Sequence, residues 1–124
     1  MLRELKPLTP NPGARPRRWF FCPDMDLVVW FEPDDTPGAF QLAYDKLRVE
    51  RSIEWDRERG FRHYVVDHGR AGRSPWAASP LLLPDGPFDR DRVLRSFLAL
   101  AAELPPGLAG FVTAKLSGAE ITAA

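Results

Sequence analysis

The residues best suited to chemistry lie close together in one stretch, IEWDRERGFRHYVVDHG, at positions 53–69. It holds both histidines of the chain, a tryptophan, a tyrosine and several charged residues. Histidine and carboxylate side chains that are held together can transfer protons, and arginine can orient an anionic substrate. The acid–base candidates are His63, Glu54 and Asp45, with Arg57 or Arg62 as the cationic group.

Metal binding and nucleophilic catalysis are both disfavoured. His63 and His68 are five residues apart, so on one extended strand their side chains point to opposite faces and cannot share an ion. The sequence has no Cys/His cluster with zinc-ligand spacing and no G-x-S-x-G motif. We therefore expect no metal and no other cofactor. Cys22 is the only cysteine, which excludes an internal disulfide and suits a reducing cytoplasm.

A second cationic place is the segment HGRAGRSPWAAS, at positions 68–79. It is rich in glycine and arginine, but no helical pattern follows it and the phosphate-loop spacing is missing. Arg70 and Arg73 are therefore candidate contacts to a small anion. The alternative is an ordinary solvated loop.

A mixture of aromatic and charged side chains on neighbouring strands favours a binding module over an enzyme. Trp, Tyr and Arg are enriched where proteins contact one another. The partner would be a protein or a small molecule, including a second copy of the chain paired through an exposed sheet edge. The binding candidates are Trp30, Tyr44, Trp55, Arg57, His63 and Tyr64, with Arg70 and Arg73 of the loop.

The charge distribution argues against a nucleic acid partner. Residues 1–18 carry five basic side chains and one acidic side chain, whereas residues 19–124 carry twelve basic and sixteen acidic ones. A nucleic-acid-binding domain normally presents a basic surface. The acidic body of this chain makes that role unfavourable.

Five segments have the composition and alternation typical of strands. The connections between them are at most six residues long, too short for parallel crossovers, so the strands should form an antiparallel meander. The nearly continuous apolar run DLVVWFE should be a central strand covered on both faces. PLLLP, at positions 80–84, is a candidate edge strand. The five expected strands are 17–22, 26–32, 39–46, 48–55 and 61–67.

The register of the hairpin within 53–69 follows if DRERG, at positions 56–60, is its loop. The expected cross-strand pairs are Trp55 with Phe61, Glu54 with Arg62, Ile53 with His63, Ser52 with Tyr64 and Arg51 with Val65. Glu–Arg and aromatic pairs of this kind each contribute a few tenths to about 1 kcal/mol. Most of the stretch is thereby explained without catalysis, but no hydrogen-bond partner is evident for His63.

The apolar spacing becomes helical after DGP, at positions 85–87. Asp89 is a suitable N-cap, and apolar residues then recur at spacings of three and four as far as Leu104. Pro105 and Pro106 end this helix, and a shorter one is expected over 108–116. Strands followed by helices predict an α+β domain, with a meander sheet of four to five strands and both C-terminal helices on one face.

The length of 124 residues and the balance of 44% hydrophobic and 27% charged residues are typical of one soluble domain. We expect an extended Pro-rich arm over 1–16, the α+β domain over 17–117 and a frayed tail over 118–124. No apolar run has the length of a membrane helix or a signal peptide, which predicts a cytoplasmic protein without membrane contact. The abundance of Ala, Arg, Pro and Asp is typical of a GC-rich bacterial genome.

Overall fold

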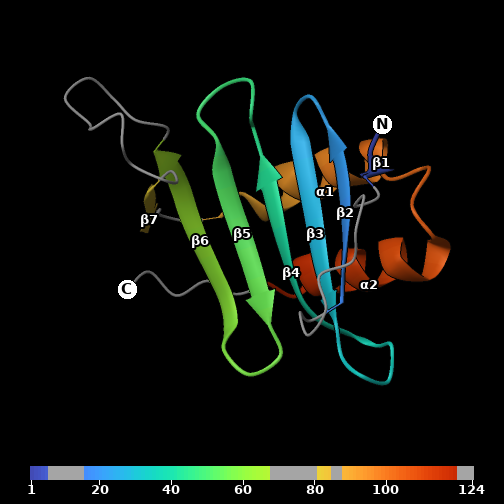
Figure 1. Ribbon diagram of the computed structural model, residues 1–124. Helices are drawn as coiled ribbons and strands as arrows, with labels where there is room; N and C mark the ends of the chain where they lie inside the picture. Colours follow the sequence, from blue (N-terminus) through green and yellow to red (C-terminus); the bar gives the residue numbers. More distant parts are fainter. Residues whose placement is uncertain (6–15, 68–80, 85–87, 120–124) are drawn as a thin grey trace.

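The computed structural model describes residues 1–5, 16–67, 81–84 and 88–119. Within these residues, seven strands form one antiparallel sheet in which each strand pairs with the next along the chain, and two helices follow (Figure 1). The predicted α+β class, meander and C-terminal helices are confirmed, although the sheet has more than the four or five strands expected. The elements are β1 (Arg3–Leu5), β2 (Arg17–Cys22), β3 (Met25–Phe31), β4 (Pro37–Tyr44), β5 (Arg51–Asp56), β6 (Gly60–Asp67), β7 (Leu81–Pro84), α1 (Arg90–Leu100) and α2 (Pro106–Ser117).

The hairpin of β5 and β6 has the register predicted from its loop length. Oδ1 of Asp56 accepts hydrogen bonds from the backbone N–H groups of Glu58 and Arg59, at 2.8 and 3.2 Å. Gly60 closes the turn with φ of 76°, a conformation that glycine adopts without steric strain. The predicted pairs are all present: Trp55 with Phe61, Glu54 with Arg62, Ile53 with His63, Ser52 with Tyr64 and Arg51 with Val65.

Both helices lie behind the same face of the sheet (Figure 1), which we call the covered face. Strand alternation assigns each side chain to this face or to the opposite one, the open face. In β3, Leu27 and Val29 point to the covered face and are fully buried. Val28 and Trp30 point to the open face and are half-buried. The prediction that this strand is covered on both faces is therefore wrong.

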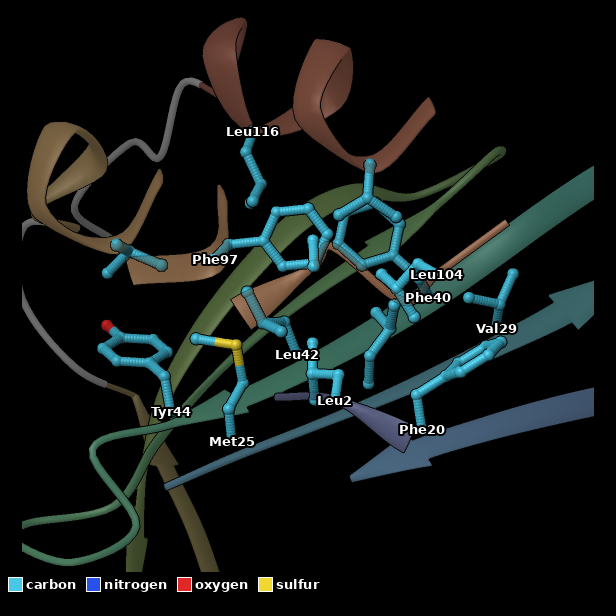
Figure 2. Close-up of a cluster of buried hydrophobic side chains, with 14 of the residues drawn as sticks. Leu2, Phe20, Met25, Val29, Phe40, Leu42, Tyr44, Phe97, Leu104 and Leu116 are labelled. Carbon is cyan, nitrogen blue, oxygen red and sulfur yellow. The ribbon is translucent and has the colours of Figure 1, made fainter. Parts of the chain in front are cut away.

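The core fills the space between the covered face and the helices. Figure 2 shows Phe97 of α1 and Leu116 of α2 reaching toward Phe40 and Leu42 of β4, and all four side chains are almost completely buried. Asp89 caps α1 as predicted, because its side chain accepts a hydrogen bond from the backbone N–H of Arg92 at 3.4 Å. Burial of these apolar side chains fixes which face of the sheet remains open.

The first residues of the chain belong to the sheet and the core. Leu2 is fully buried, and its N–H donates a hydrogen bond to the carbonyl of Leu100 at 2.9 Å. In β1, Glu4 accepts two hydrogen bonds from Arg18 of β2, at 2.9 and 2.7 Å. The predicted arm over 1–16 thus begins as an edge strand. Its residues 6–15 lie outside the described residues.

The C-terminal end of α2 is also tied to the domain. Ala119 is buried, and the Arg90 guanidinium donates to the carbonyls of Ser117 and Ala119, at 3.3 and 3.5 Å. The first residues of the predicted tail therefore pack, and 120–124 lie outside the described residues. Neither α1 nor α2, the helices of the described part of the chain, has the length and apolarity to cross a bilayer.

Candidate functional site

A hollow of about 310 Å³ opens on the open face, above β4, β5 and β6. Across the sheet, Trp30 pairs with Ala39, Ala39 with Asp56, and Asp56 with Gly60. The surface dips at Ala39 and Gly60 because these residues have little or no side chain, while the Trp30 indole stands at the β3 side. The other lining residues are Gln41, Glu54, Arg59 and Arg62, with Phe40 and Trp55 at the border.

Glu54 is a titratable group of the hollow whose pKa is shifted. Burial raises the pKa of its carboxyl above the ordinary value, and the positive charge of Arg62 partly opposes this shift. Its neighbour Gln41 donates a hydrogen bond to Ser52 Oγ at 3.3 Å rather than to Glu54. Within the described ranges, no donor contributes a hydrogen bond to the Glu54 carboxylate. This half-buried carboxylate can therefore accept hydrogen bonds from a bound molecule.

The charges in the hollow are balanced and ordered across the sheet. Glu54 and Asp56 belong to β5, whereas Arg62 belongs to β6 and Arg59 to the adjoining turn. Both arginines are exposed. Moving from β6 to β3, a bound molecule would meet cations first, carboxylates next and the Trp30 ring last.

The open face continues beyond the hollow as an apolar strip over β1, β2 and β3. Leu5, Trp19 and Val28 are paired side by side, and Leu5 and Trp19 are 41% and 37% exposed. Phe21, further along β2, is 43% exposed. Trp19 and Phe21 were not among the predicted binding residues. Their alternation with Phe20 and Cys22, which are both buried, is the sequence signal that could have identified them.

Tyr44 and His63, both predicted as contacts, lie on the covered face. The Tyr44 hydroxyl and His63 Nε2 share a hydrogen bond, and their rings are parallel at a centroid distance of 5.9 Å. Phe88 packs edge-on against both rings. Only 3% of Tyr44 and 5% of His63 are exposed. The pair supplies the partner that the sequence did not reveal for His63, and it places both residues away from the hollow.

Trp55 also faces the helices rather than the open face. It stacks on Phe40 at 5.9 Å and meets Phe111 of α2 edge-on at 5.4 Å. The ammonium group of Lys115 lies 4.5 Å from the centroid of the Trp55 ring. These contacts hold α2 against the sheet, so Trp55 has a packing role on the covered face and only borders the hollow.

Asp45, the third acid–base candidate, lies at the end of β4 and outside the hollow. It accepts two hydrogen bonds from the Arg92 guanidinium of α1, at 3.0 and 2.9 Å, and Arg51 lies 3.8 Å away. These bonds raise the pKa of Arg92. Glu54, His63 and Asp45 thus occupy three separate places, so the predicted acid–base cluster does not form.

The remaining predicted residues are spread over the molecule. Tyr64 is half-buried on the open face beside Ser52, two register positions beyond the Glu54–Arg62 pair. Arg57 is exposed in the β5–β6 turn, where its backbone N–H donates to the Gly38 carbonyl at 3.0 Å, and it does not line the hollow. Arg70, Arg73 and His68 lie outside the described residues.

Across residues 1–5, 16–67, 81–84 and 88–119, no three His, Cys, Asp or Glu side chains gather as metal ligands would. Comparison of the chain with protein-family models, curated protein sequences and solved structures gave no match. The function is therefore inferred from the residues of the hollow itself.

Proposed function

We propose that this domain is a binding module and that its ligand occupies the hollow on the open face. The observation that carries the proposal is the half-buried Glu54 carboxylate, which lines the same hollow as the Trp30 indole and accepts no hydrogen bond from the described residues. Withdrawing a carboxylate from water is unfavourable unless donors compensate it. A bound donor would supply that compensation.

The size and lining of the hollow fit a small molecule. Ligand sites combine an apolar wall with a few polar groups and occupy roughly 300–1,000 Å³. At about 310 Å³ this hollow lies at the lower end of that range. Trp30 provides the apolar wall, and Glu54, Arg59 and Arg62 provide the polar groups.

A second candidate function is proton abstraction from an anionic substrate, favoured by the raised pKa of Glu54. Glu54 would be the base, and Arg59 or Arg62 would hold the substrate. His63 takes no part in this version, because it is buried on the covered face with Tyr44. Turnover of a bound compound that stops in Glu54→Gln, while binding persists, would favour the enzyme over the binding module.

A fragment screen followed by thermal shift and fluorescence titration tests the proposal. Ala39→Leu places a large side chain in the hollow, so it should abolish binding of the hits. The matched control is Ala114→Leu, on the exposed side of α2, which should bind as the wild type does. A screen without hits, or hits that bind Ala39→Leu unchanged, would contradict the proposal.

A further inference from the structure

We infer that the ligand of the hollow is a small zwitterion, with a carboxylate and an ammonium group on one carbon and a large apolar side chain. A free α-amino acid with an aromatic or branched side chain has this chemistry. The inference rests on the proposed function, since it names the class of ligand that the same hollow would take.

The charge balance of the lining is the first reason. Two carboxylates, Glu54 and Asp56, and two guanidinium groups, Arg59 and Arg62, surround the hollow. A ligand with charge of one sign would face two like charges, and like-charge contacts in a binding site are strongly disfavoured. A zwitterion places its ammonium group near the two carboxylates and its carboxylate near the two guanidinium groups.

The order of the groups across the sheet is the second reason. Neighbouring strands are about 4.8 Å apart, so the cations of β6 and the carboxylates of β5 are separated by about one strand spacing. The ammonium and carboxylate groups of an α-amino acid are separated by a single carbon and can address neighbouring strands. Its side chain then extends over Ala39 of β4 toward Trp30 of β3.

Glu54 is the acceptor suited to the ammonium group. Oδ1 of Asp56 already accepts two backbone hydrogen bonds of the turn, from Glu58 and Arg59. Glu54 has no such donors among the residues that the structure describes, and burial raises the pKa of its carboxyl. An ammonium group would donate a charge-assisted hydrogen bond to this carboxylate.

The test uses three zwitterions, phenylalanine, tryptophan and leucine, and two single-charge analogues of the tightest binder. The amide analogue keeps only the ammonium group, and the N-acetyl analogue keeps only the carboxylate. Isothermal titration of the full chain should show the zwitterion binding at least about tenfold more tightly than either analogue, because each analogue loses a charge-assisted hydrogen bond.

Variants assign the two ends of the ligand. Glu54→Gln should weaken binding of the zwitterion and of the amide analogue, but leave binding of the N-acetyl analogue unchanged. Arg62→Gln should weaken binding of the zwitterion and of the N-acetyl analogue, but leave binding of the amide analogue unchanged. The controls are Glu58→Gln and Arg57→Gln, which change exposed charges of the same turn outside the hollow and should bind all probes as the wild type does.

The outcomes separate this inference from the proposed function. If either analogue binds as tightly as its parent, or if no zwitterion binds while fragments occupy the hollow, the zwitterion inference is overturned and the binding module stands. If neither zwitterions nor fragments bind in the hollow, both the zwitterion inference and the proposed binding function are contradicted.

Discussion

Glu54 and His63 lie on adjacent strands, one register position apart, yet their side chains leave the sheet on opposite faces. Glu54 pairs with Arg62 and lines the open hollow, whereas His63 pairs with Ile53 and is buried against Tyr44. A histidine and a carboxylate that are close in sequence are therefore separated by the thickness of the sheet. The open face is left with a carboxylate suited to binding, and the covered face has a histidine suited to packing.

The two faces should respond differently to loss of a tryptophan. Trp55→Leu removes ring contacts with Phe40 and Phe111 and should lower the free energy of unfolding by about 2 kcal/mol. Trp30→Leu, on the open face, should lower it by less than about 1 kcal/mol but abolish ligand binding. Urea denaturation of both variants checks this, and equal losses of stability would contradict the assignment of faces.

The Glu54 carboxyl should make stability depend on pH. Because its pKa is raised on folding above the ordinary value of 4.5, there is a pH window above 4.5 in which the folded domain retains this proton and the unfolded chain has lost it. Raising the pH through that window therefore favours the unfolded state. The wild type should lose stability relative to Glu54→Gln, which cannot ionise.

The size of this effect is limited by solvent. The Glu54 side chain is only half-buried, so the difference should be a few tenths of a kcal/mol. Denaturation of both proteins at pH values from about 4 to 7 measures it against the ordinary carboxyl range. A wild type that gains stability over Glu54→Gln as the pH rises would show that the carboxylate is stabilised rather than desolvated.

The Tyr44–His63 hydrogen bond should matter for stability and not for binding. Tyr44→Phe keeps the ring contacts and removes the hydroxyl, which leaves His63 Nε2 without this partner. Such a loss in a buried site costs about 1–3 kcal/mol. Chemical denaturation should show this loss, while affinity at the hollow stays at the wild-type value. A change in affinity without a change in stability would move the functional site to the covered face.

Asp45 combines a backbone requirement with an ion pair, and two variants separate them. Its φ is 54°, in the left-handed region that asparagine and aspartate tolerate better than alanine. Asp45→Asn keeps that tolerance and loses the charge opposite Arg92, whereas Asp45→Ala loses both. Thermal unfolding should show Asp45→Ala to be less stable than Asp45→Asn by about 1 kcal/mol. Equal stability would mean that the backbone conformation contributes nothing.

Much of the fold could be predicted because alternation and loop length constrain a hairpin. With a period of two, a five-residue loop between Trp55 and Phe61 leaves one consistent register, and this places Glu54 across from Arg62. The helix start at Asp89 was equally clear, because a capping side chain preceded a regular apolar spacing.

The face that the helices cover could not be predicted, because both faces of β3 carry apolar residues. Val28 and Val29 are the same residue type, but only Val29 points to the helices. Likewise Trp55 points to the helices, whereas Trp30 lies on the open face. Leu2 was missed because the strand that follows it has only three residues, too few to show a period. The hollow was missed because it depends on Ala39 and Gly60, two strands apart, facing the same way.

The indole N–H signals of the tryptophans test the central claim most directly. Trp30 lines the hollow, Trp19 lies in the apolar strip and Trp55 packs beneath α2. Titration with the tightest ligand, followed by ¹H–¹⁵N NMR, should shift the Trp30 signal most, move the Trp19 signal less and leave the Trp55 signal in place. A saturable shift at Trp55 without one at Trp30 would contradict binding in the hollow.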